Sequence, residues 1–256
     1  MIHLVASSNL AYANRITGWL DAATAYGPPD LAVTLAAVVE DGGEPWADAL
    51  ARDYPDARVL PVGRGALAFP PPLDHLQAGG FLPALAPADD DVIVFTDGDA
   101  YLQRPLTADE RGMLADWPAD VVGLAYNAGP DDTLATEGQR LRPQADPADR
   151  GFDTALPVFN LGVIVCRAAA YRRWHDAYAS LLPRLEGLFR HHAHQQWGLC
   201  AALPAAGLPS RHAEPRPRPA AHPRSRACRS PRPCRAGGGP RSSRCVQSWR
   251  RTCCNC

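Results

Sequence analysis

Two aspartates separated by one glycine, Asp97-Gly98-Asp99, are the residues whose types and spacing point most directly to chemistry. They follow the apolar, β-branched run 91–96, which has the composition of a buried parallel strand. In open α/β sheets, ligands bind at the carboxyl ends of such strands. Two carboxylates on a glycine turn can both face a divalent cation, and that cation can hold the phosphates of a nucleotide. The spacing therefore favours a nucleotide-sugar site.

The chain contains no lysine, and all 26 of its basic residues are arginine. A P-loop needs its phosphate-binding lysine, and Schiff-base enzymes need a side-chain amine. Both classes are therefore excluded. The avoidance of lysine also indicates GC-rich coding DNA.

Length and composition favour a globular protein. The chain has 256 residues, of which 46% are hydrophobic, enough for a substantial core. Residues 1–6 carry no basic region, and their apolar run is too short for a signal peptide or a membrane span. We therefore expect a cytoplasmic protein without a transmembrane segment.

The formal net charge of −1 hides two unlike parts of the chain. Residues 210–256 hold 12 arginines and one acid, whereas residues 1–209 hold 14 arginines and 26 acids. Six of the eight cysteines lie in the C-terminal part: Cys228, Cys234, Cys245, Cys253, Cys254 and Cys256. The other two, Cys166 and Cys200, fit a reducing compartment without structural disulfides.

Apolar periodicity predicts alternating strands and helices, and hence an α/β fold with a mostly parallel sheet flanked by helices. Strands are expected over residues 2–6, 31–39, 57–62, 91–96, 120–125 and 157–166. Helices are expected over residues 11–26, 46–54, 73–85, 107–117, 168–189 and 193–206. The stretch 126–153 is rich in Gly, Pro and Asp, so we expect a long functional loop there.

The folded domain is predicted over residues 1–208, followed by a disordered tail over 209–256. The tail has no Leu, Ile, Phe or Met and cannot bury a core. It could be a nucleic-acid arm or a metal site, although its only CxxC spacing joins Cys253 to Cys256. We favour a third hypothesis, a shifted reading frame, because GC-rich codons read out of frame yield these residues and the change in composition is abrupt.

Three segments, taken in order, resemble the motif set of GT-A glycosyltransferases, particularly those of family 8. They are Phe95-Thr96-Asp97-Gly98-Asp99-Ala100 with Gln103-Arg104-Pro105, Val158-Phe159-Asn160-Leu161-Gly162-Val163, and Gln195-Gln196-Trp197-Gly198-Leu199. The resemblance spans about residues 2–208. It implies a Rossmann-like GT-A fold and sugar transfer from a nucleotide-sugar, with a UDP-sugar favoured, to an acceptor such as a glycan or a lipid-linked glycan.

The resemblance also implies roles for individual residues. It assigns Asp97 and Asp99 as ligands of Mn²⁺ or Mg²⁺ on the donor diphosphate, where a metal would neutralise the charge that develops on the leaving group. The candidate catalytic residues are Asn160, Gln195 and Gln196. The candidate donor-binding residues are Ala6, Ser7, Ser8, Gln77, Asp97, Gly98 and Gly162. His75 lies with Gln77 on the helix expected before the acidic strand, from which both could reach the nucleotide.

Two departures from the family pattern predict impaired activity. Gln195 stands where the family has an aspartate, so its side chain keeps a hydrogen bond but loses the charge. Related enzymes commonly supply a third metal ligand, a histidine near the C-terminus. The candidates here, His212 and His222, lie in the segment of doubtful origin. We therefore expect weak metal binding.

Two other hypotheses remain. A haloacid-dehalogenase-type phosphatase also places a DxD after a parallel strand and binds Mg²⁺, but here the Gly-Thr that should follow is missing and the chain has no lysine. An arginine-rich nucleic-acid-binding protein would depend on the tail alone. Since the acidic body would repel DNA or RNA, we expect no nucleic-acid partner.

Overall fold

The computed structural model describes residues 1–39, 44–63, 79–126, 131–189 and 194–212. Contacts group Met1–Glu214 into one compact unit, and the description below concerns this unit.

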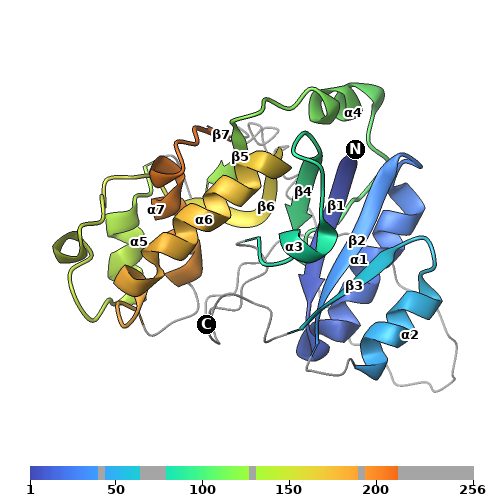
Figure 1. The fold of residues 1–256 in the computed structure, drawn as a ribbon, viewed down its shortest axis with the longest axis horizontal. Coiled ribbons are helices and arrows are strands. Elements are labelled where there is room, and N and C mark those ends of the chain that lie inside the picture. Colours follow the sequence, from blue (N-terminus) through green and yellow to red (C-terminus); the bar gives the residue numbers. More distant parts are fainter. Residues whose placement is uncertain (40–43, 64–78, 127–130, 190–193, 213–256) are drawn as a thin grey trace, which may run out of the picture. The chain divides into compact units, whose positions relative to one another are not determined.

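The unit is built on a seven-stranded sheet with the order β3-β2-β1-β4-β6-β5-β7 (Figure 1). The strands are β1 (Ile2–Ser8), β2 (Leu31–Val39), β3 (Arg58–Gly63), β4 (Val92–Thr96), β5 (Val122–Tyr126), β6 (Phe159–Arg167) and β7 (Ser210–His212). Strands β1 to β4 pair in parallel, β6 runs antiparallel to both β4 and β5, and β7 is parallel to β5. The sheet is therefore mostly parallel, as the sequence predicts.

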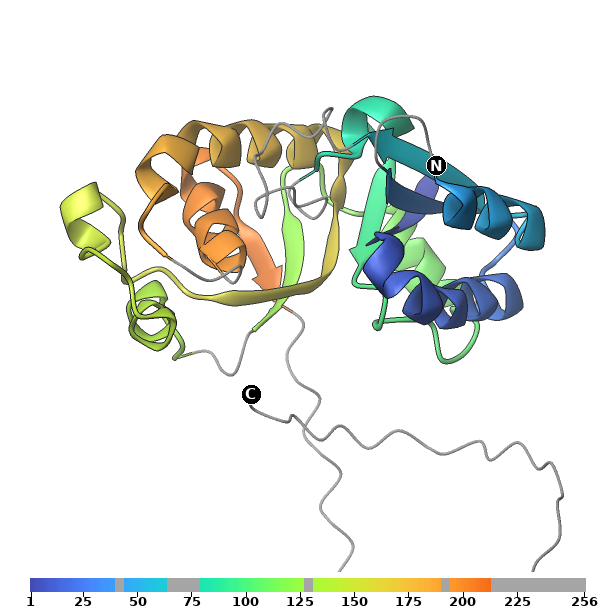
Figure 2. The same ribbon diagram turned by 90° about the horizontal axis from the view of Figure 1, so that it is seen from below.

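Helices cover both faces of the sheet (Figures 1 and 2). They are η1 (Leu10–Tyr12), α1 (Ala13–Tyr26), α2 (Pro45–Asp53), α3 (Leu82–Leu85), α4 (Ala108–Ala115), α5 (Leu134–Leu141), η4 (Ala148–Arg150), α6 (Ala168–Leu185) and α7 (His194–Ala205). Within the described residues, none of these helices combines the length and apolar character needed to cross a membrane.

Alternation along the strands divides the core between the two faces. Leu4 and Ala6 of β1 pack with Ile16 and Trp19 of α1, whereas the intervening Val5 belongs to the core under α3 and α6. This division follows from the two-residue period of a strand, which points successive side chains to opposite faces. The helical spacing seen in the sequence over 11–26 therefore marks the face of α1 that the sheet buries.

Three aromatic side chains, which the sequence favours as core residues over sugar platforms, are core residues in the structure. Trp174, Trp197 and Tyr171 have no exposed surface. The indole N–H of Trp174 donates to Leu199 O, and that of Trp197 donates to Leu134 O. These bonds satisfy buried polar groups and tie α7 to its neighbours.

The structure corrects the sequence prediction in three places. The stretch 126–153, expected to be a loop, contains α5, which begins at a Thr133 capping box, and the short helix η4. Strand β7 continues the sheet beyond Leu208, where the body was expected to end. Of the helix expected over 73–85, residues 73–78 lie outside the described residues, and α3 begins only after Gly79, whose φ of 97° is incompatible with a right-handed helix.

Candidate active site

The acidic turn is anchored from two neighbouring elements at the carboxyl end of β4. The buried Thr96 hydroxyl accepts a hydrogen bond of 2.8 Å from Trp19 Nε1 of α1. The Asp97 N–H donates to Gly162 O of β6 at 2.9 Å, and Asp97 O accepts from Ala100 N–H at 2.9 Å. The first aspartate is thus fixed between β6 and a tight turn.

Asp97, Asn160 and Gly162 come together at this edge of the sheet. The Gly162 N–H donates to Asn160 Oδ1 at 2.7 Å. A Cβ placed on Gly162 would lie 2.8 Å from Asn160 Oδ1 and 3.1 Å from Asp97 Oδ2. A larger residue here would displace the Asn160 or Asp97 side chain, and the two β6 residues singled out in the sequence lie directly against the acidic turn.

The two carboxylates differ in their surroundings. Asp97 is half-buried, whereas Asp99 is exposed, and in the described part of the chain no hydrogen bond or ion pair of the Asp99 side chain is found. On α6, burial, followed by electrostatic repulsion from Cys166 and Asp97, raises the pKa of the Tyr171 hydroxyl well above the ordinary value. The phenol is therefore neutral, while the Asp99 carboxylate faces solvent.

The end of β1 lies beside the same turn. Ala6 pairs with Thr96, the last residue of β4, so Ser7 and Ser8 continue β1 beside the start of the acidic turn. A Cβ on Gly98 would lie 3.1 Å from Ile16 Cδ1 and 3.9 Å from Ser7 O. The structure therefore brings the expected donor-binding residues of β1 next to the acidic turn.

Helix α7, whose first turn carries Gln195, packs against the start of β6. Cys200 Sγ accepts from Phe159 N–H at 3.3 Å, and further along α7 Leu203 lines a cavity with Leu156. The helix therefore lies beside the strand that carries Asn160 and Gly162.

Gln195 is a buried polar residue with an unsatisfied donor. It is 5% exposed, and within the described residues its Nε2 has no hydrogen-bond partner. Gln196 is half-buried. A buried amide N–H without an acceptor costs free energy, and a bound oxygen-bearing ligand would supply that acceptor.

The donor atoms at the turn suit a hard cation, because they are oxygens. Asp97 and Asp99 supply two carboxylates, and Gly162 leaves open the space that a Cβ would fill. Among the described residues, no group of three or more His, Cys, Asp or Glu side chains could hold a metal. The residues present therefore fit a cation that takes its remaining ligands from phosphate and water.

Of the two candidate histidine ligands, His212 is described by its backbone alone. The backbone of His212 ends β7 and pairs with Leu124 of β5. Strands β6 and β5 separate it from β4, which at ordinary strand spacing puts it roughly 14 Å across the sheet. His75, Gln77 and His222 lie outside the described residues.

Cysteine nucleophiles are disfavoured by burial. Cys166 and Cys200 are free thiols with almost no exposed surface. Burial raises the pKa of both, that of Cys200 to about 12, so neither is a thiolate near neutral pH.

Two residues near the site were not singled out as site residues from the sequence. Tyr171 has the spacing of a core residue on α6, and only the fold shows that it interacts electrostatically with Asp97. Asn9 follows β1, and its buried Oδ1 has no partner within the described residues. A polar side chain directly after a buried strand was the available signal for Asn9.

No protein-family model and no curated protein matches the sequence, but solved structures match the fold. The galactosyltransferase LgtC, solved with donor and acceptor sugar analogues, is 16% identical, with a TM-score of 0.52 over 78% of this chain and 70% of LgtC. Mouse xyloside xylosyltransferase 1 is 14% identical, with a TM-score of 0.51 over 84% of this chain and 86% of that protein. The glycosyltransferase GlyE of Streptococcus pneumoniae is 14% identical, with a TM-score of 0.50 over 83% of this chain and 45% of GlyE.

The chain has the GT-A fold. The fold class inferred from the sequence is thereby confirmed, whereas membership of family 8 stays a prediction. The comparisons favour neither the phosphatase hypothesis nor the nucleic-acid hypothesis.

Proposed function

We propose that this protein is a glycosyltransferase that moves a sugar from a nucleotide-sugar to an acceptor with the help of Mn²⁺ or Mg²⁺. The observation that carries the proposal is the convergence of Asp97, Asn160 and Gly162 at the carboxyl end of β4 in a GT-A fold. That edge is where ligands of open α/β sheets bind.

The chemistry of the leaving group explains the acidic turn. Breaking the bond between sugar and nucleotide leaves a diphosphate, so catalysis depends mainly on stabilising developing negative charge. A divalent cation supplies that stabilisation without proton transfer. Asp97 and Asp99 would hold it, and the fixed backbone of Asp97 would keep its position constant.

Other residues would bind the two ends of the donor. Backbone and hydroxyl groups of Ala6, Ser7 and Ser8, together with Gly98, lie beside the acidic turn and would contact the nucleotide. Gln77 belongs to the same proposal, although it lies outside the described residues. On the other side of the turn, Asn160, Gln195 and Gln196 would bind the sugar and act as the catalytic residues.

Gln195 has a specific role in this part of the proposal. Its buried Nε2 needs an acceptor, and a sugar hydroxyl or ring oxygen would provide one. A neutral amide cannot stabilise positive charge on the sugar, so we infer that Gln195 orients the donor.

A UDP-sugar is the donor we propose, with a glycan or lipid-linked glycan as the acceptor. LgtC was solved with donor and acceptor sugar analogues, and the second similar protein is a xylosyltransferase. These two structural neighbours support sugar transfer as a class of reaction.

Release of UDP in the presence of Mn²⁺ tests the proposal. The purified protein would be incubated with UDP-glucose, UDP-galactose or UDP-xylose, and free UDP would be measured with and without chelator. We expect metal-dependent release from one donor and its loss in Asp97→Asn. Asp176→Asn, which changes an exposed aspartate on α6, is the matched control. Equal release by wild type and Asp97→Asn would contradict the proposal.

A further inference from the structure

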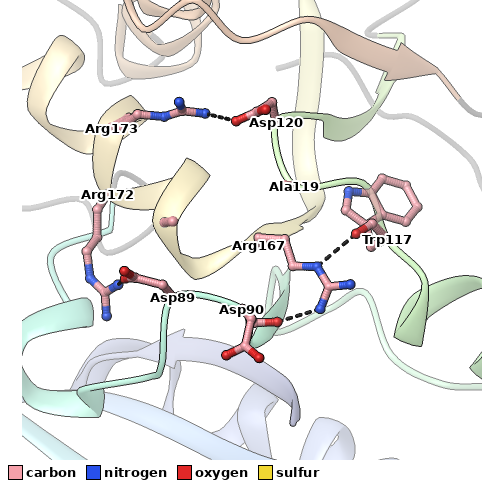
Figure 3. Close-up of a pocket in the computed structure, with 9 residues that line it drawn as sticks. Asp89, Asp90, Trp117, Ala119, Asp120, Arg167, Arg172 and Arg173 are labelled. Carbon is pink, nitrogen blue, oxygen red and sulfur yellow. Dashed lines mark hydrogen bonds and ion pairs between the residues drawn. The ribbon is translucent and has the colours of Figure 1, made fainter.

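A second cavity lies at the opposite end of the sheet from the acidic turn. Its volume is about 700 Å³, within the range of small-molecule sites. It is lined by Asp89 and Asp90 before β4, by residues 117–120 before β5, and by arginines at the start of α6 (Figure 3). Since the five residues of β4 span roughly 17 Å, this cavity is separate from the Asp97 site.

One arginine of the cavity is fixed in place. The Arg167 guanidinium donates to Trp117 O at 2.8 Å, to Ala115 O at 2.7 Å and to Asp90 O. Ala115 ends α4, so Arg167 also caps the negative end of that helix. All three acceptors are neutral carbonyls, and no carboxylate pairs with Arg167 among the described residues. The wall of the cavity thus carries a fixed positive charge.

Two further arginines hold carboxylates that a ligand could replace. Arg172 pairs with Asp89, and Arg173 pairs with Asp120 Oδ1 at 2.5 Å. The side chains of Asp89 and Asp120 are 83% and 66% exposed. Figure 3 shows the two pairs on different sides of the cavity. Exposed ion pairs are weak because water screens them, so a doubly charged anion can displace a single carboxylate.

Helix α6 begins at the cavity, whose lining carries Asp90 in addition to the three arginines and the two ion-paired aspartates. It has 18 residues, Arg167 at its N-cap and no acid in its first turn. The positive end of a helix dipole ordinarily attracts acidic residues and repels basic ones. Here three arginines gather at that end, an arrangement that favours an anionic ligand.

We propose that Arg167, Arg172 and Arg173 form a binding site for a phosphate-type dianion. In the bound state, Arg172 and Arg173 would exchange Asp89 and Asp120 for phosphate oxygens, to which guanidinium groups bind in bidentate geometry. Arg167 would keep its carbonyl bonds and contribute its charge. The site does not depend on the proposed sugar transfer.

The test is calorimetric titration of the full chain with inorganic pyrophosphate in buffer containing chelator, so that no metal bridges the anion to Asp97. We expect binding to weaken at least about tenfold in the double variant Arg172→Gln/Arg173→Gln. Asp120→Asn should bind more tightly, since it removes a competing carboxylate. Asp99→Asn should leave the affinity unchanged, which separates this site from the proposed donor site.

Arg104→Gln is the matched control, because Arg104 is also exposed and ion-paired, with Glu110. Arginines of residues 210–256 are present in every variant and contribute an equal background. Thermal unfolding of each variant would confirm that it is folded. Equal affinity of wild type and the double variant would overturn the proposal, as would weaker binding in Asp120→Asn.

The same variants distinguish the source of the phosphate. Binding to phosphatidic acid vesicles but not to phosphatidylcholine vesicles, lost in the double variant, would assign the site to a lipid headgroup. Binding of pyrophosphate without vesicle binding would assign it to a soluble phosphate. Binding of a neutral oligosaccharide at this cavity in preference to pyrophosphate would contradict the proposal.

Discussion

The two ends of β4 both carry aspartates, but the protein satisfies them very differently. At the amino end, Asp91 accepts hydrogen bonds from the Met1 ammonium at 2.6 Å and from Ala88 N–H at 2.8 Å, and His3 Nε2 lies 3.1 Å away. At the carboxyl end, Asp99 is exposed and has no such bonds within the described residues.

This difference separates a structural carboxylate from a candidate ligand-binding one. Burial alone would raise the pKa of Asp91, but its hydrogen bonds with Met1, His3 and Ala88 lower it to about 2. The negative charge of Asp91 is therefore compensated by groups of the protein itself. The charge of Asp99 remains available to a ligand. The aspartates that stabilise this protein and those that we propose bind metal should then respond to substitution in opposite ways.

The largest expected effect is on activity at the carboxyl end. Asp97→Asn should lower sugar-transfer activity by roughly 100- to 1000-fold, because the leaving-group charge loses its stabilisation. The melting temperature should change little. Steady-state assays at several Mn²⁺ concentrations, alongside thermal unfolding, would measure both. If Asp97→Asn lost much of its stability but kept its activity, Asp97 would be a structural carboxylate like Asp91, and the comparison would be contradicted.

Gly162→Ala tests the importance of the same end of β4 for activity without changing any charge. The new methyl group would lie 2.8 Å from Asn160 Oδ1 and 3.1 Å from Asp97 Oδ2, so one or both must move. We expect roughly 100-fold lower activity, since a displacement of about 1 Å at a site costs that much. Gly112→Ala, where a Cβ meets nothing within 4 Å, is the control. Equal activity of the two variants would mean that the position of Gly162 is unimportant.

At the amino end, Asp91→Asn should lower stability by about 2 kcal/mol and leave the activity of the folded protein unchanged. The folded pKa lies below the unfolded value of about 3.9, so this stabilisation is present above about pH 4 and is lost as the pH falls toward 2. Urea unfolding of both proteins between pH 2.5 and 7 would measure it. A stability difference that stayed constant over this range would argue against the charge as its cause.

The smallest effect should come from α4, which follows the acidic turn in sequence. Its N-cap Thr107 forms a capping box with Glu110, and the carbonyl of its last residue, Ala115, accepts from Arg167. Thr107→Ala should cost about 1 kcal/mol of stability through loss of the cap. Urea unfolding measures this cost, and activity assays should show no change. Reduced activity would mean that α4 positions the acidic turn.

The parallel half of the fold could be predicted from the sequence because its strands are short apolar runs between helical patterns. The reversed direction of β6 could not, since an apolar run is the same whichever neighbour it pairs with. Helix α5 was missed because, between Leu134 and Leu141, its buried face carries Glu137 and Gly138, so the apolar periodicity is interrupted. Gly138 lies against Trp197, where a Cβ would be 3.7 Å from Trp197 Nε1, an ordinary packing distance.

The site was predictable to the extent that its residues follow strands. Asp97 and Asp99 could be identified because they follow β4, and Asn160 with Gly162 through a family resemblance. The close packing of Asp97 against Gly162 depends on antiparallel pairing, which the sequence does not display. The arginine cavity joins residues 89–90, 117–120 and 167–173, and only the fold brings these three segments together.

Thermal unfolding with nucleotides tests the central claim most directly. Wild type and Asp99→Asn would be melted with UDP, GDP or ADP, each with and without Mn²⁺. A ligand at 100 times its dissociation constant adds about 2.7 kcal/mol of stability, which is readily measured as a shift in melting temperature. We predict a Mn²⁺-dependent shift with UDP that is lost in Asp99→Asn. No shift with any nucleotide, or an equal shift in both proteins, would contradict a metal-dependent donor site at the end of β4.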